Sequence, residues 1–245
     1  MGDDAVRRAR IDLAAAYRLA VLHGLNEGIC NHFTLMVPGQ RDRFLLIPFG
    51  MHWSEVRASN LLIVDFDGRV IEGDGYAEDT AFYIHAPIHR AYPEFACVMH
   101  THMTHALALN LIEDGRILPI NQNALRYTDR IAYDDHYTGL AMDDAEGDRI
   151  VRAMAGKPIA MLRHHGAIVC GAHVAAAYDD LYYLERTAMA QIAAMSTGRP
   201  LKLIEPDIER RAAAQIAAFS NTDAHGMHFA ALKRLLDRTQ PDYKE

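Results

Sequence analysis

Two apolar stretches of this chain end in closely spaced histidines. The first ends in His100 and His102, which are separated by one residue. Because successive side chains of a β-strand point to opposite faces, these two imidazoles are expected on the same side of a strand. The second stretch ends in His164 and His165, directly before Gly166, a residue that permits a sharp turn. One of these two histidines can supply a third imidazole to the same place.

Three protein ligands around an open position form the arrangement of a catalytic divalent-metal site. His105 is interpreted as part of the following helix start or of the site wall. The histidines without partner spacing are interpreted as surface or hydrogen-bonded structural residues: His23, His136, His173, His225 and His228. The chain contains no G-x-S-x-G, phosphate-loop or G-x-G-x-x-G motif, so a serine hydrolase, NTPase or dinucleotide enzyme is not indicated.

Composition limits the class of protein. The chain has 245 residues, with 25 Lys and Arg against 32 Asp and Glu, and half of its residues are hydrophobic. These proportions allow a packed core but provide no run of basic residues for nucleic-acid binding. The sequence has no membrane-spanning apolar run, we expect no signal peptide, and the three cysteines do not form a disulfide pattern. We therefore expect a cytoplasmic protein with no nucleic-acid or membrane partner.

Helical and strand patterns alternate along the chain, and no linker or repeat divides it. We expect one α/β domain over residues 1–245, with helices covering a central sheet. Short strands joined by turns, such as the pair around Asp67-Gly68, indicate antiparallel pairing. The predicted helices are 6–25, 79–91, 103–111, 147–154, 174–195, 208–219 and 228–236. The predicted strands are 33–37, 43–48, 61–64, 70–71, 95–102, 159–162 and 167–170.

Six blocks, in the same order, resemble the class II aldolase/adducin family over roughly residues 8–200. The blocks are GICNHFT at 28–34, PFG at 48–50 with SEV at 54–56, IH at 84–85 ahead of YP at 92–93, VMHTH at 98–102, RHHG at 163–166, and the long helix after Gly171. The resemblance implies a three-layer α/β/α domain with a central, largely antiparallel sheet. It also implies a homotetramer with active sites at subunit interfaces.

The same resemblance assigns the metal ligands to His100, His102 and His165. In the family the ion, commonly zinc, holds the hydroxyl and carbonyl oxygens of a small substrate and stabilises an enediolate; manganese, iron or cobalt are the other candidates. Either C–C cleavage or decarboxylation can use this Lewis-acid chemistry. The resemblance therefore implies a lyase that depends on a divalent metal.

The chain departs from the sugar-phosphate aldolases of the family at residues that move protons. Aligned back from His100 without gaps, the acid/base glutamate of those enzymes falls at Ala81. Glu78 and Asp79 are the candidate replacements. A tyrosine that serves as proton donor in the aldolases falls near Gln122, the third catalytic candidate.

Positions that cradle phosphate in the family have also changed. Asn31 and His32 occupy one such segment and Phe49-Gly50 another, while Asp79 replaces a serine. Because an aspartate repels phosphate and a phenylalanine offers no donor, these changes favour an unphosphorylated substrate. We expect Asn31, His32, Phe49 and Gly50 to bind a small hydroxy-acid, oxo-acid or sugar-like compound, with His32 meeting a carboxylate in place of phosphate.

Two alternatives remain open. The segments around Asn31-His32 and Phe49-Gly50, together with the lost glutamate, resemble the adducin branch, whose animal members are scaffolds without known catalysis. The chain could thus be a non-catalytic assembly module. The three imidazoles could also hold iron in an oxygenase or oxidative decarboxylase.

Overall fold

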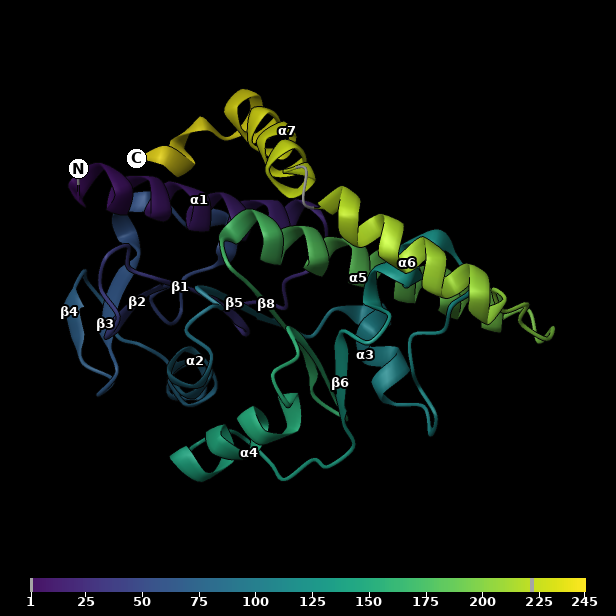
Figure 1. The fold of residues 1–245 in the computed structure, drawn as a ribbon. Coiled ribbons are helices and arrows are strands. Elements are labelled where there is room, and N and C mark those ends of the chain that lie inside the picture. Colours follow the sequence, from purple (N-terminus) through teal and green to yellow (C-terminus); the bar gives the residue numbers. More distant parts are fainter. Residues whose placement is uncertain (1, 221–222) are drawn as a thin grey trace.

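The computed structural model describes residues 2–220 and 223–245. Within these ranges one eight-stranded sheet runs in the order β4-β3-β2-β1-β5-β8-β7-β6 (Figure 1). The strands are β1 His32–Met36, β2 Arg43–Leu46, β3 Leu62–Asp65, β4 Val70–Glu72, β5 Cys97–Thr101, β6 Ile131–Asp134, β7 Ile159–Leu162 and β8 Gly166–Gly171. Neighbouring strands pair antiparallel except β6 and β7. The expected α/β domain with a largely antiparallel sheet is confirmed.

Helices cover both faces of this sheet (Figure 1). They are α1 Gly2–Leu22, α2 Asp79–Ala91, α3 Thr104–Asn110, α4 Asp144–Met154, α5 Val174–Met195, α6 Pro206–Ser220 and α7 Ala224–Thr239. Short 3-10 helices are η1 Trp53–Glu55, η2 Ala58–Asn60, η3 Gln122–Tyr127 and η4 Pro241–Lys244. In Figure 1, α1 and α5 lie above the sheet and α2 and α4 below it, while α7 packs on α1 and α5. The result is three layers.

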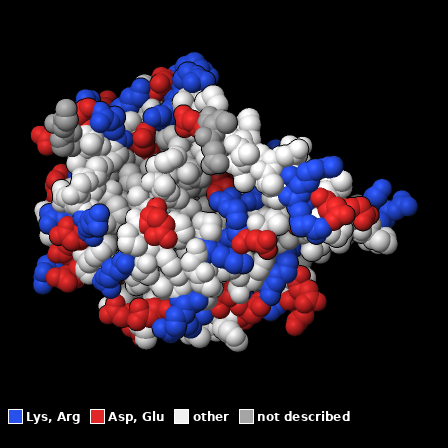
Figure 2. Space-filling view, viewed as in Figure 1, with Lys and Arg blue, Asp and Glu red and all other residues white. Residues whose placement is uncertain are grey.

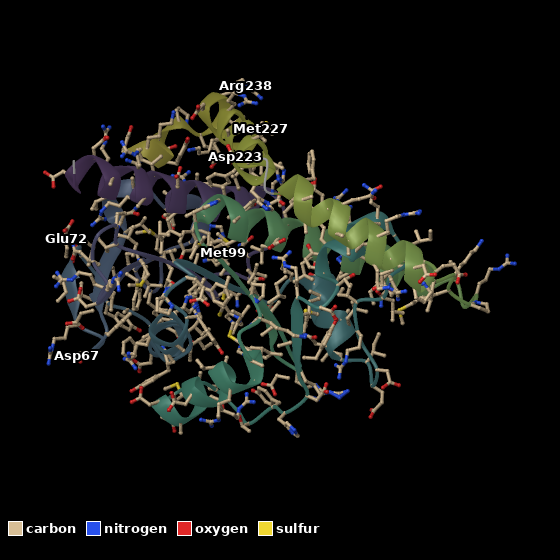
Figure 3. The ribbon with its side chains drawn as sticks, in the orientation of Figure 1. Asp67, Glu72, Met99, Asp223, Met227 and Arg238 are labelled. Atoms are coloured by element: carbon tan, nitrogen blue, oxygen red, sulfur yellow. The ribbon has the colours of Figure 1, made fainter. Side chains whose placement is uncertain are left out.

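The two faces of β5 enter different hydrophobic cores. Met99 joins the core that α1 and α5 build, and it lies in the interior of the molecule (Figure 3). Val98 joins the core of α2 and α4, with Ile84 and Ile150. This alternation is the period of two that a strand buried on both faces requires. It places His100, two residues after Val98, on the α2 side of the sheet.

Strand register brings a further histidine next to His100. On one side β5 pairs with β1, where His32 is opposite His100 and Thr34 is opposite Val98. On the other side β5 pairs with β8, where Ile168 is opposite His100. Because β5 is flanked by two strands, the backbone around His100 is held on both sides. The sheet thus fixes where this imidazole lies.

Most predicted elements form, and one strand was missed. β6 is four residues long, and its run Ile-Ala-Tyr-Asp lacks the continuous apolar character of the equally short β7. It pairs parallel with β7 at the sheet edge, through a crossover that contains α4. The predicted helix over 6–25 is α1, which begins at Gly2 and ends at Leu22. β5 ends at Thr101, so His102 follows the strand rather than ending it.

Acidic and basic side chains are mixed over the surface. On the described part of the face in Figure 2, lysines and arginines alternate with aspartates and glutamates and form no continuous basic area. This agrees with the small negative charge of the sequence. None of the helices in the described ranges has the length and apolar character that crossing a membrane would require.

Candidate metal centre

Three imidazoles meet at one end of the central strands. His100 is the second-last residue of β5, and His102 directly follows the strand. His165 lies in the turn between β7 and β8. The possible ligand atoms of the three side chains all lie within 4.8 Å of one another. Two nitrogens bound about 2.1 Å from a tetrahedral ion lie about 3.4 Å apart, so small ring rotations would bring all three onto one ion. The predicted convergence of these histidines is confirmed.

The turn before β8 decides which histidine is the third member. His164 takes a left-handed backbone conformation with φ of 60° and is exposed, whereas His165 faces His100 with ring centroids 4.6 Å apart. Gly166 is needed for a different reason than a sharp turn. A Cβ at this position would lie 2.4 Å from the Thr101 carbonyl oxygen and 2.7 Å from the His102 ring. Only glycine lets β8 approach so closely.

Hydrogen bonds fix the orientation of two of the rings. His100 Nδ1 donates to the Ala167 carbonyl oxygen at 3.1 Å, and His102 Nδ1 donates to Glu27 Oε2 at 2.6 Å. In its neutral form, a ring that donates from Nδ1 carries a free electron pair on Nε2. His102 Nε2 is buried and has no hydrogen-bond partner. A buried nitrogen without a partner is costly unless something else occupies it.

The protonation states also suit a metal ion. Burial lowers the pKa of His100 well below its usual value, and the neighbouring imidazoles lower it further. Burial and the nearby His102 lower the pKa of His165 to about 4. Both rings are therefore neutral near pH 7. Neutral imidazoles with one nitrogen held by a protein acceptor are the form in which histidine binds metals, so these three residues fit a divalent ion.

A cavity of about 410 Å³ opens beside the cluster. All three histidines line it, as do four residues from the sequence-based predictions: Asn31, His32, Phe49 and Glu78. Gly50 follows Phe49 in the chain but does not line the cavity. Among its described lining residues there is no lysine or arginine. The wall is largely apolar, with polar groups gathered near the imidazoles.

The three catalytic candidates lie in different places. Glu78 caps α2: its side chain accepts from the Ala81 backbone N–H and from the Thr80 hydroxyl, and its Oε2 lies 3.7 Å from His32 Nε2. Asp79 is exposed and does not line the cavity, and Gln122 is exposed at the start of η3, also away from the lining. Of the three, Glu78 alone faces the cavity.

Asn31 connects the metal cluster to the cavity. It takes a left-handed backbone conformation with φ of 71°, which asparagine tolerates better than most residues. Its Oδ1 accepts from the His102 backbone N–H at 3.2 Å, while its buried Nδ2 has no partner. An unpaired amide donor at a cavity wall is free to bind a ligand oxygen.

Sequence reasoning missed the residues that support these groups. Glu27 lies in the loop after α1, far in sequence from His102, and nothing in its surroundings marks it. His85 forms a hydrogen bond with His32, and Thr34 forms one with His85. A signal existed for these two: Thr34 is two residues from His32 in a strand pattern. The sequence alone did not show that α2 would place His85 against that face.

The sequence is similar to that of known proteins. The family model "Class II Aldolase and Adducin N-terminal domain" matches residues 11–192. A protein of Caulobacter vibrioides, provisionally named a class 2 aldolase, is 35% identical over 97% of this chain and 92% of its own length. Mouse alpha-adducin is 33% identical over 83% of this chain, which spans only 28% of that protein.

The same relationship holds for solved structures. The crystal structure of an aldolase II superfamily protein from Pseudomonas syringae superposes with a TM-score of 0.92, at 35% identity, over 98% of this chain and 96% of the other. Fold, sequence and the three-histidine cluster agree. The chain belongs to the class II aldolase and adducin family.

Proposed function

We propose that this protein is a divalent-metal-dependent lyase that cleaves or decarboxylates a small hydroxy-carbonyl compound. One observation carries the proposal: three imidazoles converge at a cavity wall, and one of them keeps a buried, unpaired nitrogen. His100, His102 and His165 would hold the ion, with zinc the first candidate. A divalent ion bound there supplies Lewis-acid polarisation of a substrate oxygen.

Glu78 is proposed as the group that moves the proton. A carboxylate can do this only within reach of the substrate, and Glu78 lines the cavity whereas Asp79 and Gln122 do not. Its hydrogen bonds to Thr80 and to the Ala81 backbone hold the carboxylate in one place. The same bonds cap α2, so this residue combines a structural and a chemical role.

The substrate is proposed to lack a phosphate group. Phosphate sites in proteins usually contain arginine, lysine or a cluster of backbone N–H donors. The described lining contains neither a lysine nor an arginine, and Glu78 adds a negative charge. A cavity of about 410 Å³ holds a compound of a few carbons. We therefore favour a small hydroxy-acid, oxo-acid or sugar-like compound.

Metal analysis tests the proposal directly. The protein purified without added metal should contain close to one divalent ion per chain, and His100→Ala, His102→Ala or His165→Ala should remove most of it. His164→Ala is the matched control, because this exposed neighbour lies outside the cluster. Metal that is absent from the wild type, or that survives all three substitutions, would contradict the proposal. Iron together with substrate-dependent oxygen uptake would instead support the oxygenase alternative.

The proposed assembly is a homotetramer that closes the cavity mouth. Large apolar side chains are exposed there: Phe49 is 41% exposed and Leu140 is 70% exposed. Tyr76 packs on Phe49 with ring centroids 5.4 Å apart and is itself exposed. Such a group of apolar residues is typical of a contact surface. Light scattering should give a mass near four chains, and Leu140→Glu should lower it; a monomeric wild type would contradict this assembly.

A non-catalytic assembly module is the second candidate function. It is favoured by Ala81 at the position of the aldolase glutamate and by the 33% identity to mouse alpha-adducin. This function predicts an oligomer that does not depend on metal and no turnover of any hydroxy-carbonyl compound. Oligomer mass before and after chelation separates it from the lyase when measured with activity.

A further inference from the structure

A line of buried polar side chains lies between the sheet and α2, behind the cavity. His32 and Thr34 come from one face of β1, and His85 and His89 come from successive turns of α2. All four are buried. Because buried polar groups are stable only when hydrogen-bonded, their arrangement must satisfy strict donor and acceptor rules.

Each contact in the line is short. His89 Nδ1 lies 3.0 Å from the Phe95 carbonyl oxygen, and its Nε2 lies 2.8 Å from Thr34 Oγ1. Thr34 Oγ1 lies 2.6 Å from His85 Nδ1. His85 Nε2 lies 2.7 Å from His32 Nδ1. Only His32 Nε2 remains outside the line, and it faces Glu78 at 3.7 Å.

The carbonyl at one end sets the direction of every bond. The Phe95 oxygen can only accept, so His89 Nδ1 donates and, in a neutral ring, His89 Nε2 accepts. Thr34 must then give its single hydroxyl proton to His89, so its oxygen accepts from His85 Nδ1. His85 Nε2 is left as an acceptor, and His32 Nδ1 must donate to it. The neutral His32 ring therefore carries no proton on Nε2.

Burial supports the neutral state along the line. It lowers the pKa of His89 to about 4, and it lowers the pKa of His85 well below the usual value. A charged ring in this layer would face another imidazole and no carboxylate except Glu78, at the cavity end.

We propose that this line makes His32 Nε2 a fixed hydrogen-bond acceptor, so that the cavity selects a substrate with a hydroxyl group at this point. The inference rests on the proposed function and names the substrate class for the same site. A carboxylate offers no proton to His32 and would lie beside the Glu78 carboxylate, so a hydroxyl replaces the carboxylate that the sequence pointed to. Asn31, with its unpaired Nδ2, lines the same cavity and can donate to the oxygen of that hydroxyl.

Three related probes separate a hydroxyl from a carboxylate at His32. Dihydroxyacetone carries a hydroxyl group at both ends. Hydroxyacetone has a methyl group in place of one CH2OH group, and hydroxypyruvate has a carboxylate in place of that CH2OH group. His32→Phe should weaken dihydroxyacetone binding about five- to tenfold, the size of one lost hydrogen bond. Binding of the other two probes should change less than twofold. A larger loss for hydroxypyruvate than for dihydroxyacetone would overturn the inference.

Thr34 tests the line itself, because it is a positioning residue that does not line the cavity. Thr34→Val keeps the shape but removes the hydroxyl, and it should weaken dihydroxyacetone binding as His32→Phe does. Thr34→Ser restores the hydroxyl and should restore the affinity. Equal behaviour of the valine and serine variants would contradict a role for the line in binding.

The tautomer can also be observed in the folded wild type without any ligand. In ¹⁵N solid-state spectra of histidine-labelled protein, His32 should show a protonated Nδ1 and an unprotonated Nε2, assigned by their loss in His32→Phe. A proton on His32 Nε2 would overturn the inference. The tautomer is independent of metal content, so a metal-free protein with this tautomer would refute the lyase but not the acceptor role.

Discussion

Histidines gather in two regions of this molecule and behave in opposite ways. At the cavity, His100 and His165 face other imidazoles, and burial holds their pKa values low. On α7, His225 and His228 both contact the buried carboxylate of Asp179 at 2.9 and 2.6 Å. There the carboxylate raises the pKa of His225. His100 and His165, which face other imidazoles at a buried place, are held neutral and can bind a cation, whereas the Asp179 carboxylate favours the charged form of His225.

Removing the carboxylate from the second region should give the largest loss of stability. Asp179 on α5 accepts hydrogen bonds from Arg126, His225 and His228, and its pKa is held below the usual range by these partners against the opposing effect of burial. Asp179→Asn leaves a partly buried guanidinium without its counter-charge, which costs about 3–5 kcal/mol. Chemical unfolding measures the loss.

Asp207→Asn is the matched control for that substitution. Asp207 also pairs with an arginine, Arg210, but both side chains are exposed, so the change should cost less than about 1 kcal/mol. If Asp179→Asn lowers stability as little as Asp207→Asn does, the contacts of His225 and His228 with Asp179 do not hold α7 on α5. Metal content should be unchanged in both variants.

In the cavity, the largest effect outside the metal ligands should come from Glu78. Glu78→Gln keeps the shape but removes the proton acceptor, so kcat should fall by about two to four orders of magnitude while metal content stays the same. Asp79→Asn, one residue further along, should keep full activity because it does not line the cavity. Steady-state rates with hydroxy-carbonyl compounds measure both; full activity of Glu78→Gln would assign the proton transfer to another group.

The close approach of β8 to the cluster gives a third prediction. Gly166→Ala places a methyl group against the Thr101 carbonyl oxygen and the His102 ring. Backbone must shift to relieve this contact, so we expect about 1–3 kcal/mol lower stability together with weaker metal binding. Gly156→Ala is a useful contrast, since no atom lies within 4 Å of its Cβ and only its positive φ opposes the change. Unchanged metal affinity in Gly166→Ala would show that the three rings tolerate this shift.

The convergence of His100 and His102 followed from strand periodicity, but the choice between His164 and His165 did not. That choice depends on the backbone of the turn, because His164 takes the left-handed conformation and lines the cavity outside the three-ring cluster. The three layers were predictable from alternating elements. Edge strand β6 was not, since Ile-Ala-Tyr-Asp lacks the continuous apolar run of β7 and its pairing with β7 is decided by tertiary contacts.

The groups that support the site could not be predicted from the sequence either, because contacts between distant residues position them. Glu27 and His102 are far apart in the chain, and only the packed fold brings their side chains to 2.6 Å. His85 and His89 are spaced one helical turn apart, a visible pattern. What they face, however, is set by where α2 lies on β1, and no local pattern encodes that placement.

The pH dependence of stability gives the smallest expected effect and the sharpest contrast between the two kinds of histidine. Burial lowers the pKa of His89 to about 4, so the unfolded chain binds this proton first and stability falls as pH drops from about 6.5 towards 4. The pKa of His225 is raised by Asp179, with Asp180 adding to the effect and burial and Arg126 opposing it. Its contribution is complete below about pH 6.5 and is lost as pH rises through the folded-state pKa.

Unfolding curves across this range should therefore show loss of stability on both sides. His225→Gln should flatten the alkaline side and leave the acidic side unchanged. An unchanged alkaline side in this variant would mean that Asp179 does not hold His225 in its protonated form.

The central claim is that His100, His102 and His165 share one divalent ion. Crystals grown from protein purified without added metal would test it through an anomalous-scattering map. We expect one strong peak among the three imidazoles, at bonding distance from His102 Nε2, with an absorption edge that identifies the element. A map without a peak there, in crystals whose three rings keep the arrangement described above, would contradict the account.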